Sequence, residues 1–194
     1  MKKTLIIVAV VAVVAIWGVS TYNGLVSSQE GVAAKWAQVE SAYQRRADLI
    51  PNLVETVKGY AAHEENTLTE VVEARAKATS VTVDPKALTP EAIAQFQKAQ
   101  GELTSALGRL LLVKENYPDL KANENFLELQ AQLEGTENRI NVARDAFNES
   151  ARAFNTKVRQ FPANIVASLC KFDTKAYFEA DESAAQAPKV SFEK

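Results

Sequence analysis

The sequence predicts an all-α protein, an elongated up-and-down four-helix bundle preceded by one N-terminal transmembrane helix. Only seven Gly and six Pro occur among 194 residues, and long stretches consist of good helix formers. Apolar residues recur at spacings of three and four along most of the chain, which is the period of an amphipathic helix. An uncharged apolar stretch stands near the start, at residues 5–19. We therefore expect an anchor at 1–21, a helical bundle at 22–170 and an irregular tail at 171–194 that docks on the bundle.

The apolar stretch follows Lys2 and Lys3 and is about 15 residues long, somewhat short of the roughly 20 that cross a bilayer. We interpret it as an uncleaved anchor, because no helix breaker follows it and Trp17 and Tyr22 stand where interfacial aromatic residues belong. The alternative is a signal peptide cleaved near residues 18–20. The two lysines place the bundle on the periplasmic or extracellular side, although two charges leave the opposite orientation open.

The next apolar stripe, at 25–50, predicts a helix that continues from the anchor. Pro51 is expected to end or kink it, with a second helix at about 48–78. Arg46 falls on the apolar stripe, where a long side chain can extend to solvent or pair with a carboxylate such as Asp48 or Glu55.

A loop rich in β-branched residues and proline, 79–90, separates the second helix from a third. Thr89 and Pro90 form a helix start, and the apolar stripe runs on to about Asn116. A fourth helix, at about 122–160, would be roughly 60 Å long at 1.5 Å per residue. Large apolar residues recur every seven positions along it: Phe126, Leu133, Ile140, Phe147, Phe154 and Phe161. The position three further on is mostly small, which favours close packing between helices.

An asparagine follows three of these large residues and lies on the shoulder of the stripe. We expect the three amides to bond a carboxylate or amide of a neighbouring helix and so to fix the helix register. The alternative is a ladder that binds a ligand or partner. The candidates for setting register or for interaction also include charged residues near the asparagines and one on the apolar stripe at 25–50. The full set is Asn141, Asn148, Asn155, Glu137, Arg144 and Arg46.

The composition excludes several functions. A net charge of −2, without a basic run, argues against nucleic acid as a partner. The only histidine, His63, and the only cysteine, Cys170, cannot form a paired zinc or di-iron ligand set, so no metal, cofactor or catalytic residue is predicted. Cys170 is expected to be buried and inert. The tail is expected to dock through its apolar residues Phe172, Tyr177, Phe178, Val190 and Phe192.

Several stretches resemble the LemA family of bacterial membrane proteins. They are YNGLV (22–26), QRRADLIPNLVETVKGYAAHE (44–64), LGRLLLVKENYPDLKANENFLELQAQLEGTENRI (107–140), the FN pairs at 147 and 154, RQFP (159–162) and PKVSF (188–192). The resemblance implies one transmembrane helix, a four-helix bundle and a place in the bacterial inner (cytoplasmic) membrane as a single-pass protein. It implies no catalytic residue set and no cofactor.

The expected function is that of a non-enzymatic scaffold or assembly component at the membrane surface. Its expected partners are the lipid bilayer, further copies of the chain in a homo-oligomer, and an unidentified protein. The alternative is a bundle that binds a lipid or other apolar ligand in a cavity lined by Trp36, Tyr43, Phe147 and Phe154. An enzyme is the less favoured third possibility, because no phosphate loop, nucleophile elbow or Cys/His cluster is present.

Overall fold

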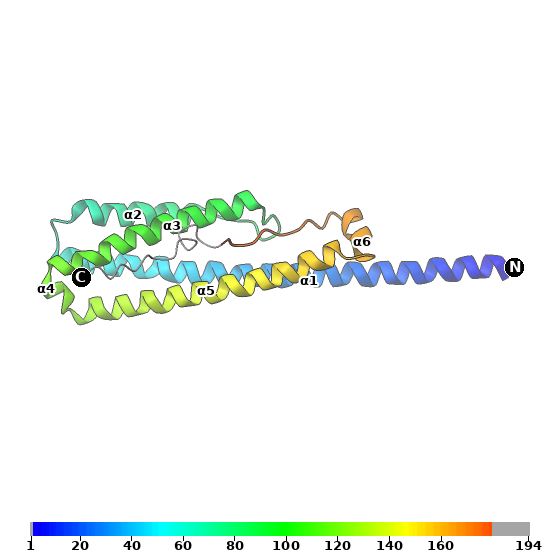
Figure 1. The fold of residues 1–194 in the computed structure, drawn as a ribbon, viewed down its shortest axis with the longest axis horizontal. Helices are drawn as coiled ribbons and strands as arrows, with labels where there is room; N and C mark the ends of the chain where they lie inside the picture. The colour runs from blue at the N-terminus through cyan, green and yellow to red at the C-terminus, as the bar shows by residue number, and fades with distance from the viewer. Residues whose placement is uncertain (1, 180–194) are drawn as a thin grey trace, which may run out of the picture.

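The computed structural model describes residues 2–179, and within them it contains helices and no strand, which confirms the all-α prediction. Four helices alternate in direction along an elongated bundle (Figure 1). They are α1 (Lys2–Tyr60), α2 (Glu65–Ser80), α3 (Pro90–Leu112) and α5 (Glu124–Arg159). Three short elements connect or follow them: the 3-10 helix η1 (Val113–Asn116), α4 (Pro118–Lys121) and α6 (Ala163–Leu169).

Helix α1 extends far beyond the other helices at its N-terminal end (Figure 1). Residues 2–17 are all exposed, and the first buried side chain is that of Leu25. Near its N-terminus α1 contains a window of 18 residues, none of them buried, that by length and composition could cross a membrane. No break separates it from the part of α1 that packs in the bundle, so anchor and first bundle helix are one continuous element.

The prediction that a new helix begins near Asp48 is wrong, because α1 runs through Pro51 to Tyr60. Proline has no N–H, so the carbonyl of Ala47, four residues earlier, loses its usual helical partner. The side chain of Arg75 in α2 replaces that partner, with Nε donating to Ala47 O at 2.8 Å. The chain reverses only after Tyr60, in the turn before α2.

The start of α3 follows the predicted capping pattern, and α5 is capped in a similar way. Thr89 accepts a hydrogen bond from the Ala92 N–H, and Pro90 occupies the first turn of α3. Asn123 caps α5 in the same way by accepting from the Phe126 N–H at 2.9 Å. Both helices therefore begin within two residues of where the sequence placed them.

The core consists of two apolar clusters on either side of a polar layer. The cluster far from the anchor joins the end of α1 to α2, α3 and α5, with Ile50, Leu103 and Leu133 nearest the layer. The cluster near the anchor is rich in aromatic residues: Trp36, Tyr43, Phe96, Phe147, Phe154 and Phe178. Five of the six large heptad residues of α5 are buried as predicted, but Phe161 is 81% exposed. It is exposed because α5 ends at Arg159 and the chain turns away from the bundle at Pro162.

Helices α2 and α3 are shorter than α1 and α5 and leave the anchor-side part of that pair uncovered (Figure 1). The loop between α2 and α3 and the extended segment 172–179 cover it, with Val83, Leu88 and Phe178 buried in the aromatic cluster. Val190 and Phe192, which were expected to dock as well, lie outside the described residues.

Candidate functional site

A central polar layer lies between the two apolar clusters and consists of Arg46, Gln100, Thr104 and Glu137. Arg46 is 1% exposed, and its Nη1 donates to Glu137 Oε1 at 2.7 Å and to Thr104 Oγ1 at 2.8 Å. Its Nη2 donates to Gln100 Oε1 at 2.6 Å. One side chain from α1 thereby connects α3 and α5.

Arg46 pairs with a carboxylate, which was one of the two possibilities given, but the partner is Glu137 and not Asp48 or Glu55. Asp48 accepts from Gln44 on the surface. The side chain of Glu137 is 40% exposed, so water screens this ion pair from one side. A buried charge held by three specified acceptors penalises any sliding of α1 against α3 or α5. The layer therefore links α1 to both α3 and α5 through one guanidinium.

Two of the three candidate asparagines of α5, Asn148 and Asn155, bind the backbone of the segment 172–179. Asn155 Nδ2 donates to Lys175 O at 2.8 Å, and its Oδ1 accepts from Lys175 N at 2.7 Å. Asn148 makes the same pair of bonds with Phe178, at 3.0 and 2.9 Å. Asn141 is exposed and makes no side-chain hydrogen bond within residues 2–179. The expected partners on neighbouring helices are thus replaced by an extended stretch of backbone.

The seven-residue spacing of the asparagines has a geometric cause. Seven helical residues rise about 10.5 Å, and the three residues from Lys175 to Phe178 span about 10 Å when extended. An amide at every seventh position of α5 therefore meets the backbone at every third residue of the segment. Each amide pairs with main-chain N–H and C=O groups, and Asn155 Nδ2 also donates to the Tyr177 hydroxyl at 2.9 Å.

Two charged side chains link the segment 172–179 to its neighbours on either side. Arg144 of α5 donates to Glu179 O at 2.9 Å, and its guanidinium lies 4.9 Å from the ring centre of Phe178. Lys175 is 6% exposed and donates through Nζ to Lys86 O at 2.6 Å, in the loop between α2 and α3. Burial lowers the pKa of Lys175 below its ordinary value, with Asp173 and Asp84 opposing the shift. The segment thereby ties the loop to α5.

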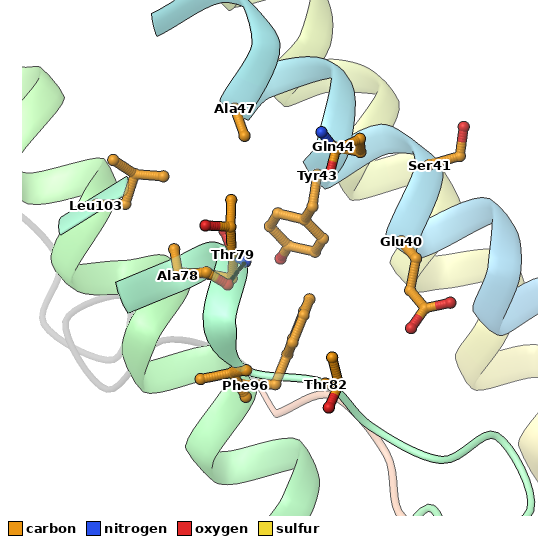
Figure 2. A pocket seen from close by; sticks show the side chains of 12 residues that line it. Glu40, Ser41, Tyr43, Gln44, Ala47, Ala78, Thr79, Thr82, Phe96 and Leu103 are labelled. Atoms are coloured by element: carbon orange, nitrogen blue, oxygen red, sulfur yellow. Dashed lines mark hydrogen bonds between the residues drawn. The ribbon is translucent and has the colours of Figure 1, made fainter. Parts of the chain in front are cut away.

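A surface pocket of about 330 Å³ opens beside the polar layer, between α1 and the α2–α3 pair. Figure 2 shows the rings of Tyr43 and Phe96 in it, 5.0 Å apart between centres. Of the four residues predicted to line an apolar cavity, only Tyr43 lines this pocket. The other three, Trp36, Phe147 and Phe154, are fully buried in the aromatic cluster.

Within residues 2–179 no group of three or more His, Cys, Asp or Glu side chains lies close enough to hold a metal ion. His63 is exposed in the turn between α1 and α2. Cys170 is also exposed, so the expectation of a buried thiol is wrong. The reason is that α6 is only seven residues long and buries Ala167, not the residue after its end.

A helical bundle that continues without a break into an exposed apolar helix defines a membrane-associated helical protein. The chain belongs to the LemA family, whose model matches residues 35–192. It is 27% identical to the magnetosome protein MamQ of Magnetospirillum gryphiswaldense over 189 residues, which cover 88% of this chain and 68% of that protein. It is 26% identical to the protein LemA of Metamycoplasma hominis over 160 residues, 82% of this chain and 69% of that protein.

Proposed function

We propose that this protein is a non-enzymatic, membrane-anchored helical scaffold that acts as an assembly component at the membrane surface. The observation that carries the proposal is the continuity of α1. Its residues 2–17 are exposed and mostly apolar, whereas residues 25–57 supply the buried face of the bundle. A bundle built on the same helix as its anchor is joined to it without a flexible linker, which suits a protein that holds others close to the membrane.

The proposal includes homo-oligomers. Val142 is 70% exposed on α5, and with Ala143 and Ala146 it lines a mostly apolar surface depression of about 400 Å³ next to α1. An exposed apolar patch beside polar residues is a common feature of protein–protein contact surfaces. This face supports lateral contact between bundles that stand on the same membrane, and an unidentified second protein is the other partner proposed.

Photo-crosslinking in membranes tests this proposal. A photoreactive amino acid replaces Val142 in the full chain, and the matched control carries it at Val72, which is 52% exposed on α2. We expect covalent homo-oligomers from position 142 and few or none from position 72. A full chain that stays monomeric in the membrane at both positions, and that has the mass of a monomer in mild detergent, would contradict the scaffold proposal.

A further inference from the structure

An exposed apolar surface lies at the end of the bundle that faces the anchor. Ile165 and Leu169 are 48% and 79% exposed, and their spacing of four places them on one face of α6. Phe161, in the turn directly before α6, is 81% exposed. We call these three side chains the α6 apolar face.

The α6 apolar face lies at the level where α1 leaves the bundle. Helix α6 packs against α1, and Figure 1 shows it beside α1 at the base of the N-terminal extension. The ring of Phe172, just after α6, contacts the ring of Tyr22 with centres 5.7 Å apart. Tyr22 follows the apolar stretch 5–19 by about one helical turn. If this stretch spans a membrane, α6 stands at its surface.

The backbone defines where α6 ends and how the chain leaves it. After Cys170 the chain adopts a left-handed conformation at Lys171, with φ 56°. The Phe172 N–H donates to Ala167 O at 2.9 Å, and the Lys171 N–H donates to Ser168 O at 3.4 Å. This pair of bonds is a Schellman motif, which ends a helix at a defined residue and redirects the chain. Ala167, on the inner face of α6, is 1% exposed, so the opposite face is fixed outward.

Positive charges accompany this apolar surface. Lys157 and Arg159 are exposed in the last turn of α5, and Lys171 is exposed after α6. Asp173 is the one exposed carboxylate between residues 157 and 173. An apolar helix face with flanking cations is the pattern of an interfacial element that enters the headgroup region of an anionic bilayer.

From these observations we propose that α6 is a second membrane contact, in which Phe161, Ile165 and Leu169 enter the lipid headgroup region next to the point where α1 emerges. The inference rests on the membrane anchoring in the proposed function. It goes beyond that function because a second contact fixes the rotation of the bundle about α1 and its tilt to the bilayer, whereas a single helix leaves both free.

The native cysteine allows a direct test. Cys170 is the only cysteine of the chain, it is exposed, and it follows Leu169. The full chain is labelled there with an environment-sensitive fluorophore and reconstituted in vesicles of phosphatidylcholine and phosphatidylglycerol. We expect blue-shifted emission, weak quenching by aqueous iodide, and strong quenching by lipids that carry a nitroxide near the headgroup. Double substitution Phe161→Asp and Leu169→Asp should red-shift the emission and raise iodide quenching severalfold.

The matched control is Leu112→Asp, since Leu112 is also well exposed, at 67%, but lies at the end of α3. It should leave both signals unchanged. Emission typical of water in the native chain, or equal effects of the control and the double variant, would overturn the proposal. Blue-shifted emission that lipid nitroxides do not quench would also overturn it and would indicate that a second protein copy covers α6. Loss of the chain from the membrane fraction would instead contradict the anchoring by α1.

Discussion

The bond between Arg75 and the Ala47 carbonyl gives the sharpest energetic prediction. Arg75→Met keeps most of the aliphatic side chain and removes the donor. Ala47 is 2% exposed, so its carbonyl, which Pro51 leaves without a helical partner, cannot easily turn to water. Losing a charged donor to a buried acceptor costs about 1.5–3 kcal/mol, and we expect the free energy of unfolding to fall by that amount.

The cause can be separated from other roles of Arg75 by repeating the substitution in a Pro51→Ala background. The alanine introduced there restores an N–H four residues after Ala47, so the ordinary helical hydrogen bond can form. In that background Arg75→Met should cost no more than about 0.5 kcal/mol, the range of ordinary surface substitutions. The coupling free energy between the two positions should therefore be about 1–2.5 kcal/mol.

Urea titration of the full chain in mild detergent measures these free energies. Trp36 is fully buried, so in a Trp17→Phe background it is the single tryptophan and reports unfolding of the bundle. The control is Arg109→Met, which removes a cation that is paired with a carboxylate on the surface and should cost little. An equal cost of Arg75→Met with and without Pro51 would refute the explanation.

Three further predictions follow from the polar contacts. Glu137→Ala leaves the Arg46 guanidinium with one acceptor fewer and should lower the free energy of unfolding in the urea assay by about 2–4 kcal/mol. Glu137→Gln keeps an acceptor and should lower it by less. Asn155→Ala should weaken docking of the segment 172–179 by about 2 kcal/mol and speed its amide hydrogen exchange roughly thirtyfold, while Asn141→Ala on the same helix should change nothing. The ammonium of Lys77 donates to Glu102 and lowers the pKa of that carboxyl below 4.5, so the stability it contributes is present above pH 4.5 and is lost as the pH falls through the lowered pKa. In a Lys77→Gln variant the free energy of unfolding should fall less steeply with pH over that acidic range. An unchanged pH dependence would contradict the attribution of this stability to the Lys77–Glu102 pair.

Features that depend on neighbouring residues could be predicted from the sequence. The heptad of large apolar residues from Phe126 to Phe154 predicted the buried face of α5, because a helical period determines which side chains share a face. The Thr89–Pro90 pair predicted where α3 begins, since capping involves groups within one turn.

Features that depend on distant residues could not be predicted. Whether α1 continues through Pro51 depends on Arg75 in another helix, and the sequence carries no local sign of that bond. The asparagine partners lie in a segment without helical periodicity, so the sequence suggested neighbouring helices instead. Arg46 and Glu137 were both candidates, but their pairing spans 91 residues. Gln100 was missed, although a polar residue on the apolar stripe between Phe96 and Leu103 was a usable signal.

The unbroken length of α1 has a mechanical consequence. At 1.5 Å per residue its 59 residues form a rod of about 88 Å, of which roughly 60 Å lie beyond the apolar stretch. If the apolar stretch spans a membrane, such a rod places the α4 end of the bundle roughly 60 Å from the lipid. It also acts as a lever, because a small angular change where α1 meets the lipid becomes a displacement of many ångströms at the far end.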